Sequence, residues 1–352
     1  MNRPADDPLL TSDPPGFSTT EAQQIAKLRF GIEGQASPLW SERDQNFRLQ
    51  TAGKNQFVLK IANAQEDPQV IDFQQQALQH IAATDPGIPV PRILPDLEGG
   101  HYSLARDTQG REHMVRLISW LEGDQVQETE ASDALLQDMG RLLARLGVAL
   151  RDFDHPASHH ELLWDLKHAA RLATLLEYIR DAQLRSLVAA AVDRFKTHVT
   201  PALKSLRSQV IHADLNRGNV LVSKEAPMHV TGIIDFGDMV FTPLVMDLAI
   251  AAAYHLAEDG DPLARVMVFI KAYHQVVPLQ REEAEILADL LLARLCTSIT
   301  LQNWRASLYP ENSEYLLVHG AHTRSRLRHA MSFPREALQQ RILSGLGFTG
   351  PA

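Results

Sequence analysis

Two neighbouring stretches decide the fold, residues 210–222 (VIHADLNRGNVLV) and residues 230–238 (VTGIIDFGD). The end of the first and the start of the second consist mainly of β-branched and aliphatic side chains, and the short segment between them predicts an antiparallel hairpin. Asn219 directly precedes the first of these strands, and Asp235 ends the second. A hairpin therefore brings Asn219 and Asp235 to the same open end.

The side chains at that end suit phosphoryl transfer. An amide oxygen beside a carboxylate makes a site for Mg²⁺, which takes oxygen ligands and keeps water or phosphate in its other positions. Asp214 lies five residues before Asn219, where it can accept or orient a hydroxyl proton. The alternative is an ordinary polar turn, the usual setting of single Asp or Asn residues in loops. The full pattern H-x-D-x-x-x-x-N followed by I-D-F-G matches the two catalytic signatures of kinases in order and favours the functional interpretation.

A third element supports this interpretation. Lys60 ends the β-like run of residues 57–60 (FVLK), which stands before a single helical segment. It resembles the strand lysine with which kinases hold nucleotide phosphates. A surface lysine at the end of a strand is the alternative, and the order of the three motifs favours the phosphate contact.

The pattern of apolar residues changes near residue 122. Before it, short β-like runs surround one helical segment, and after it apolar residues recur with helical spacing. This predicts an α+β fold with two lobes, a small N-terminal antiparallel sheet lobe and a larger, mainly helical C-terminal lobe. The expected strands are 45–50, 56–61 and 113–118, and the expected helices include 68–83, 161–180, 184–206, 261–277 and 281–303.

Composition narrows the class of protein. The chain has 352 residues and a formal net charge of -9, so no overall basic field favours nucleic acid or an anionic membrane. Its longest uncharged apolar run, residues 248–257, is about half the ~20 residues that a membrane span needs. The first twenty residues lack the apolar segment of a signal peptide and are expected to be disordered. The single cysteine, Cys296, is expected to be a buried thiol in a cytoplasmic protein.

With these motifs together, the chain resembles the aminoglycoside phosphotransferase-like branch of the protein-kinase fold, and within it the hydroxylysine kinase-like group. The resemblance runs from about residue 25 to 330. It rests on the catalytic motifs and on four further stretches: 41–47 (SERDQNF), 58–60 (VLK), 88–91 (IPVP) and 245–251 (VMDLAIA).

The resemblance implies a role for each matching residue. Asp214 would be the catalytic aspartate, Asn219 and Asp235 the Mg²⁺ ligands, and Lys60 the contact to the α- and β-phosphates of ATP or GTP. Composition, apolar pattern and resemblance together divide the chain into a disordered segment 1–20, a nucleotide-binding lobe 21–121 with a hinge at 117–123, and a catalytic and substrate lobe 122–352.

Further residues follow from the same resemblance. Backbone groups of Ser119 and Leu121 in the hinge would meet the purine. There is no G-x-G-x-x-G loop; Gly31, Gly34 and the stretch 36–43 occupy its place. Backbone amides there, with Ser37 or Ser41, would cover the phosphates instead. The partner of Lys60 on the small-lobe helix would be Asp72, with Gln74 as the alternative.

Two acids follow the second stretch. Asp238, directly after the Gly237 turn, is a candidate for holding a substrate ammonium group, and a solvated turn acid is the alternative. The family implies that Asp247 ties down the catalytic loop, whereas an acid in the first turn of a helix also serves as an ordinary favourable terminus.

The resulting hypothesis is a small-molecule kinase that phosphorylates a hydroxyl of an amine-bearing acceptor, with hydroxylysine as the first candidate. Homoserine, an amino alcohol or an aminoglycoside stay open as acceptors, as do the choice of ATP or GTP and the oligomeric state. A catalytically silent nucleotide-binding scaffold of the same fold is the competing class. A protein kinase is disfavoured, because no A-P-E signature follows Asp235 and little chain is left for an activation segment.

Overall fold

The computed structural model describes residues 12, 14–41, 43–126, 131–225, 228–308 and 320–348. The chain divides into two compact units. The N-terminal unit runs to Glu122 and also takes in residues 155–158 and 232–234, and the C-terminal unit holds the remainder. None of the described helices is long and apolar enough to cross a membrane.

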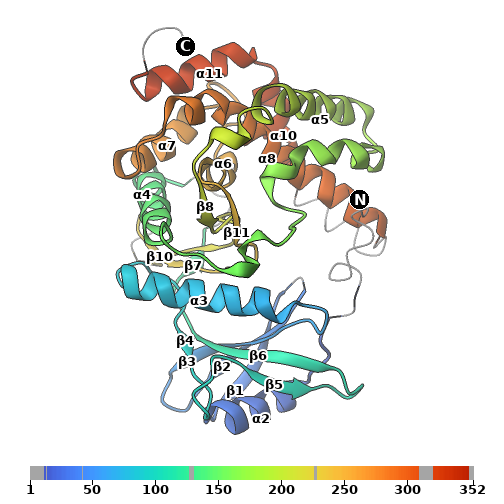
Figure 1. The fold of residues 1–352 in the computed structure, drawn as a ribbon, viewed down its shortest axis with the longest axis vertical. Coiled ribbons are helices and arrows are strands. Elements are labelled where there is room, and N and C mark those ends of the chain that lie inside the picture. Colours follow the sequence, from blue (N-terminus) through green and yellow to red (C-terminus); the bar gives the residue numbers. More distant parts are fainter. Residues whose placement is uncertain are drawn as a thin grey trace. The chain divides into compact units, whose positions relative to one another are not determined.

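The N-terminal unit is a six-stranded sheet with a helix on each face (Figure 1). The order β1-β2-β3-β6-β4 runs through antiparallel pairs, and β5 also pairs with β6. Strands predicted at 45–50 and 56–61 form with those bounds, because alternating apolar residues flank a turn at which Lys54 adopts a positive φ of 65°. The elements are α2 (Thr19–Phe30), β1 (Gln35–Leu39), β2 (Gln45–Gln50), β3 (Gln56–Ile61), α3 (Pro68–Thr84), β4 (Ile93–Leu94), β5 (Ser103–Arg106) and β6 (Glu112–Ser119).

The core of this unit shows why the sheet needs both helices. On one face, α2 packs buried side chains onto those of β2, β3 and β6. On the other, Ile71 of α3 meets Ala62 and Met114. Asp67 caps α3 through the Gln69 N–H, and a proline in its first turn favours the helical start.

The expectation that residues 1–20 are disordered is wrong for the last part of that segment. Phe17 is buried in the core beneath α2, and its backbone exchanges two hydrogen bonds of 2.8 Å with the Gln45 side chain. Ser18 then forms a capping box with Glu21. Residues 1–11 and 13 lie outside the described residues.

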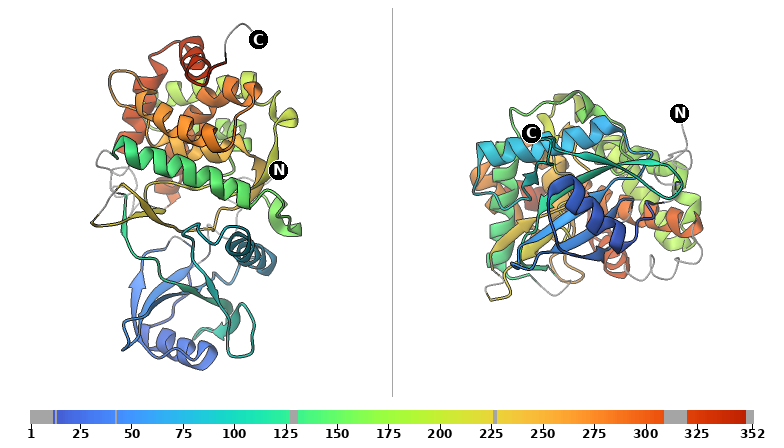
Figure 2. Two further views of the ribbon diagram at one scale, coloured as in Figure 1. Left: turned by 90° about the vertical axis from the view of Figure 1, so that its left-hand side faces the viewer. Right: turned by 90° about the horizontal axis from the view of Figure 1, so that it is seen from below.

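The C-terminal unit is built around α8 (Arg281–Leu308), a helix of 28 residues buried along most of its length. Helices α5, α6, α10 and α11 and the segment η3 pack against it (Figure 2). Helix α4 lies so close to α7 that a Cβ at Gly140 would come within 2.5 Å of the Phe269 carbonyl oxygen. The other helices are α4 (Asp133–Ala149), α5 (Ala182–Arg194), α6 (Val245–Ala253), α7 (Ala264–Val276), α10 (Ala321–Met331) and α11 (Arg335–Gly345).

Two of the helices expected in this unit take a different form. Residues expected as a helix at 161–180 form the 3₁₀ segment η3 (Leu166–Tyr178), and the segment 184–206 begins within α5 and continues through a π-helical turn, η4 (Phe195–Val199). Apolar spacings of three and four residues fit both 3.0 and 3.6 residues per turn over such lengths, so the pattern alone did not separate them. The remaining short segments are η2 (Pro156–His159) and η5 (Leu203–Ser205).

Two small sheets carry the motif stretches. One has the order β10-β9-β7, and in the other β8 pairs with β11. Because so few residues connect β9 to β10, these neighbours must be antiparallel, as the sequence predicts. The bounds are β7 (Asp124–Gln125), β8 (Ser208–Ile211), β9 (Val220–Val222), β10 (Val230–Ile233) and β11 (Val240–Pro243).

Candidate active site

The loop after β8 is held in an unusual backbone conformation. Ala213 has a positive φ of 63°, a region that L-residues with a Cβ rarely adopt. Its N–H donates to the Asp247 carboxylate at 2.9 Å, and Asp247 lies in the first turn of α6 with 2% of its surface exposed. Asp247 therefore ties down the loop, as the family pattern implied, and the strained turn sets the direction of the next residue, Asp214.

His212 packs behind this loop. It is fully buried, its ring meets Phe236 edge-on with centroids 4.7 Å apart, and its Nδ1 accepts the Asp214 N–H at 3.2 Å. His212 therefore supports the backbone of the loop and does not compete with the Asp214 carboxylate.

Asp214 has its two carboxylate oxygens held by different partners. Arg294 Nη2 donates to Oδ1 at 2.7 Å. The side-chain amides of Asn216 and Asn219 donate to Oδ2 at 2.9 and 2.8 Å. The carboxylate keeps an exposed fraction of 18%, so it is fixed in direction while still open to an acceptor.

Two acidic side chains, Asp235 and Asp238, and one basic side chain, Arg294, act on the charge of Asp214. Burial raises the pKa of Asp214 to about 7, and Asp238 and Asp235 raise it further, against the opposing effect of Arg294. A pKa near neutrality suits a group that must accept a proton from an alcohol. The three acids also leave a local negative charge that a divalent cation would offset.

Asn219 and Asp235 fit such a cation. The Asn219 amide nitrogen donates both to the Asp214 carboxylate and to the Asp214 carbonyl oxygen, which leaves the amide oxygen as its ligand atom. Asp235 adopts a positive φ of 61°, is exposed, and accepts the Gly237 N–H at 3.2 Å on Oδ1. One amide oxygen and one carboxylate are the oxygen donors that Mg²⁺ accepts while it keeps phosphate and water in its other positions.

The described residues contain no group of three His, Cys, Asp or Glu side chains that could hold a metal. A site with one carboxylate and one amide oxygen, completed by nucleotide phosphates, is of a different kind.

Asp238 is half-buried, and it lies close enough to Asp214 and Arg294 to affect the pKa of both. This position is compatible with the predicted contact to a substrate ammonium group. Its assignment to the substrate stays a prediction.

Lys60 lies near the end of β3 in the N-terminal unit and is half-buried. Its cross-strand neighbours are Asn46 on β2 and Arg116 on β6. Within the described residues it forms no ion pair, so its ammonium group is available for an anion from outside the chain.

The prediction that Asp72 pairs with Lys60 is wrong. The Asp72 carboxylate accepts from His155 at 3.2 Å and from Gln76 at 2.7 Å. Gln74, the alternative, accepts from Arg116 at 3.0 Å. Counting helical turns in the sequence located the right part of α3. It did not predict the rotation of α3 about its axis, which places Gln74 against Arg116, the cross-strand neighbour of Lys60.

The predicted nucleotide contacts of the backbone lie in ordered segments. The Ser119 N–H donates to the Arg92 carbonyl at 2.9 Å, which leaves only its carbonyl for a purine. The Leu121 N–H has no backbone acceptor among the described residues. Ser41 lies in the turn between β1 and β2 beside Trp40, which is 79% exposed, while Glu42 falls outside the described residues.

Sequence reasoning missed Arg294, which belongs to α8 and contacts Asp214 across 80 residues of chain. It is 3% exposed, donates from Nε to the Tyr254 hydroxyl at 3.0 Å, and lies over the rings of Trp164 and Tyr254 at 5.4 and 5.6 Å. The signal was present, because Arg294 and Asp289 are the charged residues in the otherwise uncharged run 286–301. A buried arginine requires a partner or a function.

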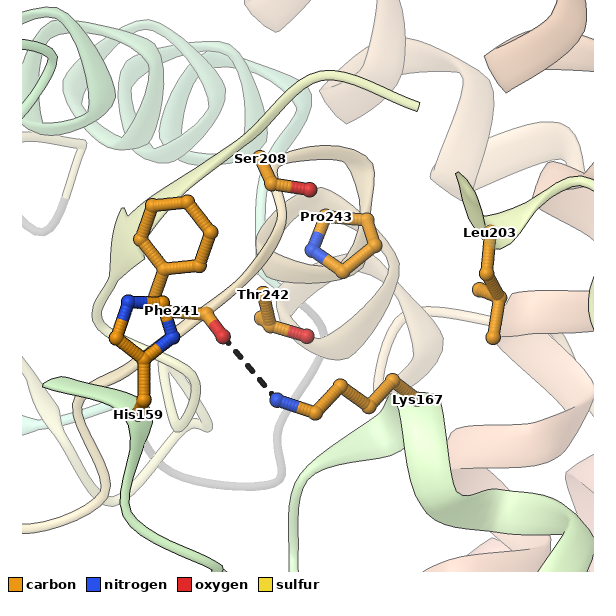
Figure 3. Close-up of a pocket in the computed structure, with 7 residues that line it drawn as sticks. All are labelled: His159, Lys167, Leu203, Ser208, Phe241, Thr242 and Pro243. Atoms are coloured by element: carbon orange, nitrogen blue, oxygen red, sulfur yellow. Dashed lines mark hydrogen bonds between the residues drawn. The ribbon is translucent and has the colours of Figure 1, made fainter. Parts of the chain in front are cut away.

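A separate pocket of about 240 Å³ lies at the other end of the β8–β11 pair (Figure 3). Lys167 points across it and donates to the Phe241 carbonyl at 3.2 Å, and its ammonium also pairs with the buried Asp165 at 2.7 Å. His159 lies against the Phe241 ring with centroids 4.6 Å apart. Because Asp165 already balances the lysine charge, this pocket offers no uncompensated cation, and we assign it a structural role.

Similarity to known proteins supports the kinase interpretation. A model of the phosphotransferase enzyme family matches residues 35–286. The hydroxylysine kinase of Bos taurus is 30% identical over 347 residues, which cover 93% of this chain and 92% of that protein. The homoserine kinase of Paraburkholderia phymatum is 26% identical over 292 residues, which cover 78% of this chain and 84% of that protein.

Among solved structures, the amicoumacin kinase hAmiN, in complex with AMP-PNP, Ca²⁺ and Ami, has a TM-score of 0.69 and 18% sequence identity. The match covers 92% of this chain and 97% of that one. At this identity the likeness concerns the fold alone, and it confirms the predicted α+β, kinase-like class.

Proposed function

Because this chain belongs to the phosphotransferase enzyme family, we propose that it transfers the γ-phosphate of ATP or GTP to the hydroxyl group of a hydroxylated amino acid, with 5-hydroxylysine as the first candidate. The chain is a small-molecule kinase that acts on an alcohol group of an amine-bearing acceptor. The resemblance drawn from the motifs is confirmed.

One observation carries the proposal, the carboxylate of Asp214 with three donors fixed on it beside Asn219 and Asp235. Positioning and charge neutralisation account for most of the catalysis in phosphoryl transfer, and this arrangement serves both. Asp214 orients the acceptor hydroxyl and takes its proton as the new O–P bond forms. The bond from the γ-phosphorus to the bridging oxygen of the nucleotide breaks in the same transfer, and the nucleoside diphosphate leaves. Bound Mg²⁺, on the Asn219 amide oxygen and the Asp235 carboxylate, would neutralise phosphate charge.

The N-terminal unit supplies the nucleotide contacts in this proposal. Lys60 holds the α- and β-phosphates, and the backbone of Ser119 and Leu121 meets the purine. The turn that contains Ser41 covers the phosphates with backbone amides. Within the part of the chain that the structure describes, the Lys60 ammonium group forms no ion pair and the Leu121 N–H has no backbone acceptor, which supports these roles.

The acceptor is proposed from the relatives and from the charges near Asp214. The hydroxylysine kinase of Bos taurus matches nearly the full length of both chains, which favours a hydroxylated amino acid. Asp238 is placed to attract an ammonium group such an acceptor would carry. Homoserine, an amino alcohol or an aminoglycoside remain the alternative acceptors, and the proposal places the reaction in the cytoplasm, in keeping with a single buried thiol.

A screen of nucleotide consumption tests the proposal. The protein is incubated with MgATP or MgGTP and with 5-hydroxylysine, homoserine, an amino alcohol or an aminoglycoside, and the phosphorylated product is identified by mass spectrometry. Turnover is expected to be fastest with 5-hydroxylysine. Tight binding of magnesium nucleotide without turnover of any acceptor would instead indicate a silent scaffold.

A further inference from the structure

We propose that Arg294 binds the carboxylate of the acceptor through Nη1, and that the enzyme is therefore selective for free hydroxyamino acids over amino alcohols that lack this carboxylate. The inference rests on the proposed function, because it names the acceptor class of the same site. The supporting observation is how the nitrogens of the Arg294 guanidinium group are bonded.

The donors of Arg294 are unequally used. Nη2 meets Asp214, and Nε meets the Tyr254 hydroxyl. Nη1 is buried and has no hydrogen-bond acceptor among the residues that the structure describes. A buried donor without an acceptor is costly, and native proteins rarely keep one without a function for it.

The position of Nη1 selects the kind of anion. Arg294 is bonded to Oδ1 of Asp214, whereas Asn219, the proposed cation ligand, is bonded to Oδ2. The guanidinium and the Asn219 amide therefore contact different oxygens of the Asp214 carboxylate. The acceptor, whose hydroxyl must reach Asp214, is the nearer source of an anion, and guanidinium groups bind carboxylates strongly.

The same geometry limits the length of the acceptor. The hydroxyl would contact Asp214, and the carboxylate would contact Nη1 of the same guanidinium group whose Nη2 lies 2.7 Å from Asp214 Oδ1. The hydroxyl must then be separated from the carboxylate by only a few carbon atoms. Asp238 lies near both groups and can receive the ammonium of such an acceptor.

Entry of the carboxylate requires a local movement. Nη1 is buried, so a neighbour must shift before an acceptor reaches it. The ring of Trp164 lies 5.4 Å from the guanidinium carbon, is half-buried, and stands on a turn before η3. We expect Trp164 to be that neighbour, because Tyr254 is hydrogen-bonded to Arg294.

A matched pair of acceptors tests the inference. Homoserine and 3-aminopropan-1-ol differ only in the carboxylate, so the ratio of their kcat/KM values isolates its contribution. A charge-assisted hydrogen bond to a buried group predicts a preference of about 10- to 100-fold for homoserine in the unmodified enzyme. In Arg294→Lys, which keeps a positive charge near Asp214 but loses the second amino group, the ratio is expected to fall toward one.

Two controls separate the possible outcomes. Tyr254→Phe leaves the Nη1 edge intact, so it should lower kcat/KM for both acceptors and preserve their ratio. If Arg294→Lys lowers both values equally, Arg294 acts on Asp214 or on the phosphoryl group, and the inference is overturned. Absence of turnover with any acceptor, with nucleotide still bound, would overturn the proposed function itself.

A measurement on the unmodified enzyme covers the case in which Arg294→Lys does not fold. With 5-hydroxylysine as the varied substrate, 2-aminobutyrate should inhibit competitively and more strongly than propylamine, which lacks the carboxylate. Equal inhibition by the two compounds would contradict the inference.

Discussion

Two arginine–carboxylate pairs join α8 to the two ends of β8, and both have a shortest N–O distance of 2.7 Å. Before the strand, Arg207 meets Glu283 of α8. After it, Asp214 meets Arg294 of α8. The first pair has the acid on the helix and the second has the arginine there.

The pairs differ in which partner is buried and in how fully it is bonded. Glu283 is fully buried and receives two donors from Arg207 and the Gln280 N–H, while the arginine is 37% exposed. In the second pair the arginine is 3% exposed and keeps a nitrogen without an acceptor among the described residues, while Asp214 is the more open partner. The fully bonded pair fixes α8, and the incompletely bonded pair is the one that we propose to bind the acceptor.

The largest effect is expected when the acid of the Asp214–Arg294 pair is replaced. Asp214→Asn keeps the shape of the side chain but removes the proton acceptor, and should lower kcat by about 10²- to 10⁴-fold. Binding of magnesium nucleotide should persist, as measured by titration calorimetry. Unaltered turnover in this variant would refute the mechanism.

Breaking the Arg207–Glu283 pair should lower stability without changing the catalytic reaction. Glu283→Gln removes the buried charge while Arg207 can turn to solvent, so the free energy of unfolding should fall by about 2 to 3 kcal/mol in urea titrations. The kcat/KM value measured well below the unfolding transition should not change. A loss of activity in the folded variant would show that the two pairs are coupled.

A pH series on Asp247 examines the second support of the Asp214 loop. Burial raises the pKa of Asp247 to about 6, so the folded state holds this proton more tightly than the unfolded state. The bound proton contributes its full stabilisation of the folded state below about pH 4, and this stabilisation is lost as pH rises through 6. Relative to Asp247→Asn, the unmodified protein should lose about 1 to 3 kcal/mol of unfolding free energy between those values. A constant difference across the series would argue against this burial.

The smallest effect is expected at a partly exposed pair in the N-terminal unit. Asp72 is 43% exposed and meets His155 at 3.2 Å, so Asp72→Asn should change the unfolding free energy by less than about 1 kcal/mol. The KM for nucleotide should not change, because Asp72 does not contact Lys60. A marked rise in that KM would restore the predicted pairing.

The sequence predicts those parts of the molecule that depend on local pattern. Strands β2 and β3 alternate apolar side chains on either side of a turn, and the hairpin of β9 and β10 follows from the same signals. Helix α2 was missed, because it buries only Ala22, Ala26 and Phe30 in an otherwise polar segment. Its place under the sheet depends on packing and not on periodicity.

The candidate site divides in the same way. Asp214 and Asn219 are five residues apart in one loop, so their contact follows from chain order. Arg294 comes from 80 residues away, and only the packing of α8 brings it to Asp214. The error at Asp72 has the same origin, since the rotation of α3 about its axis depends on which residue meets Arg116.

Cys296 stands two residues after Arg294 on α8 and is fully buried, which raises the pKa of its thiol well above the usual range. A thiol reagent can therefore reach it only when α8 opens to solvent. Since the chain has a single cysteine, the rate at which such a reagent modifies the protein reports how often its central helix becomes exposed. Slower modification in the presence of an acceptor would then report binding without any measurement of turnover.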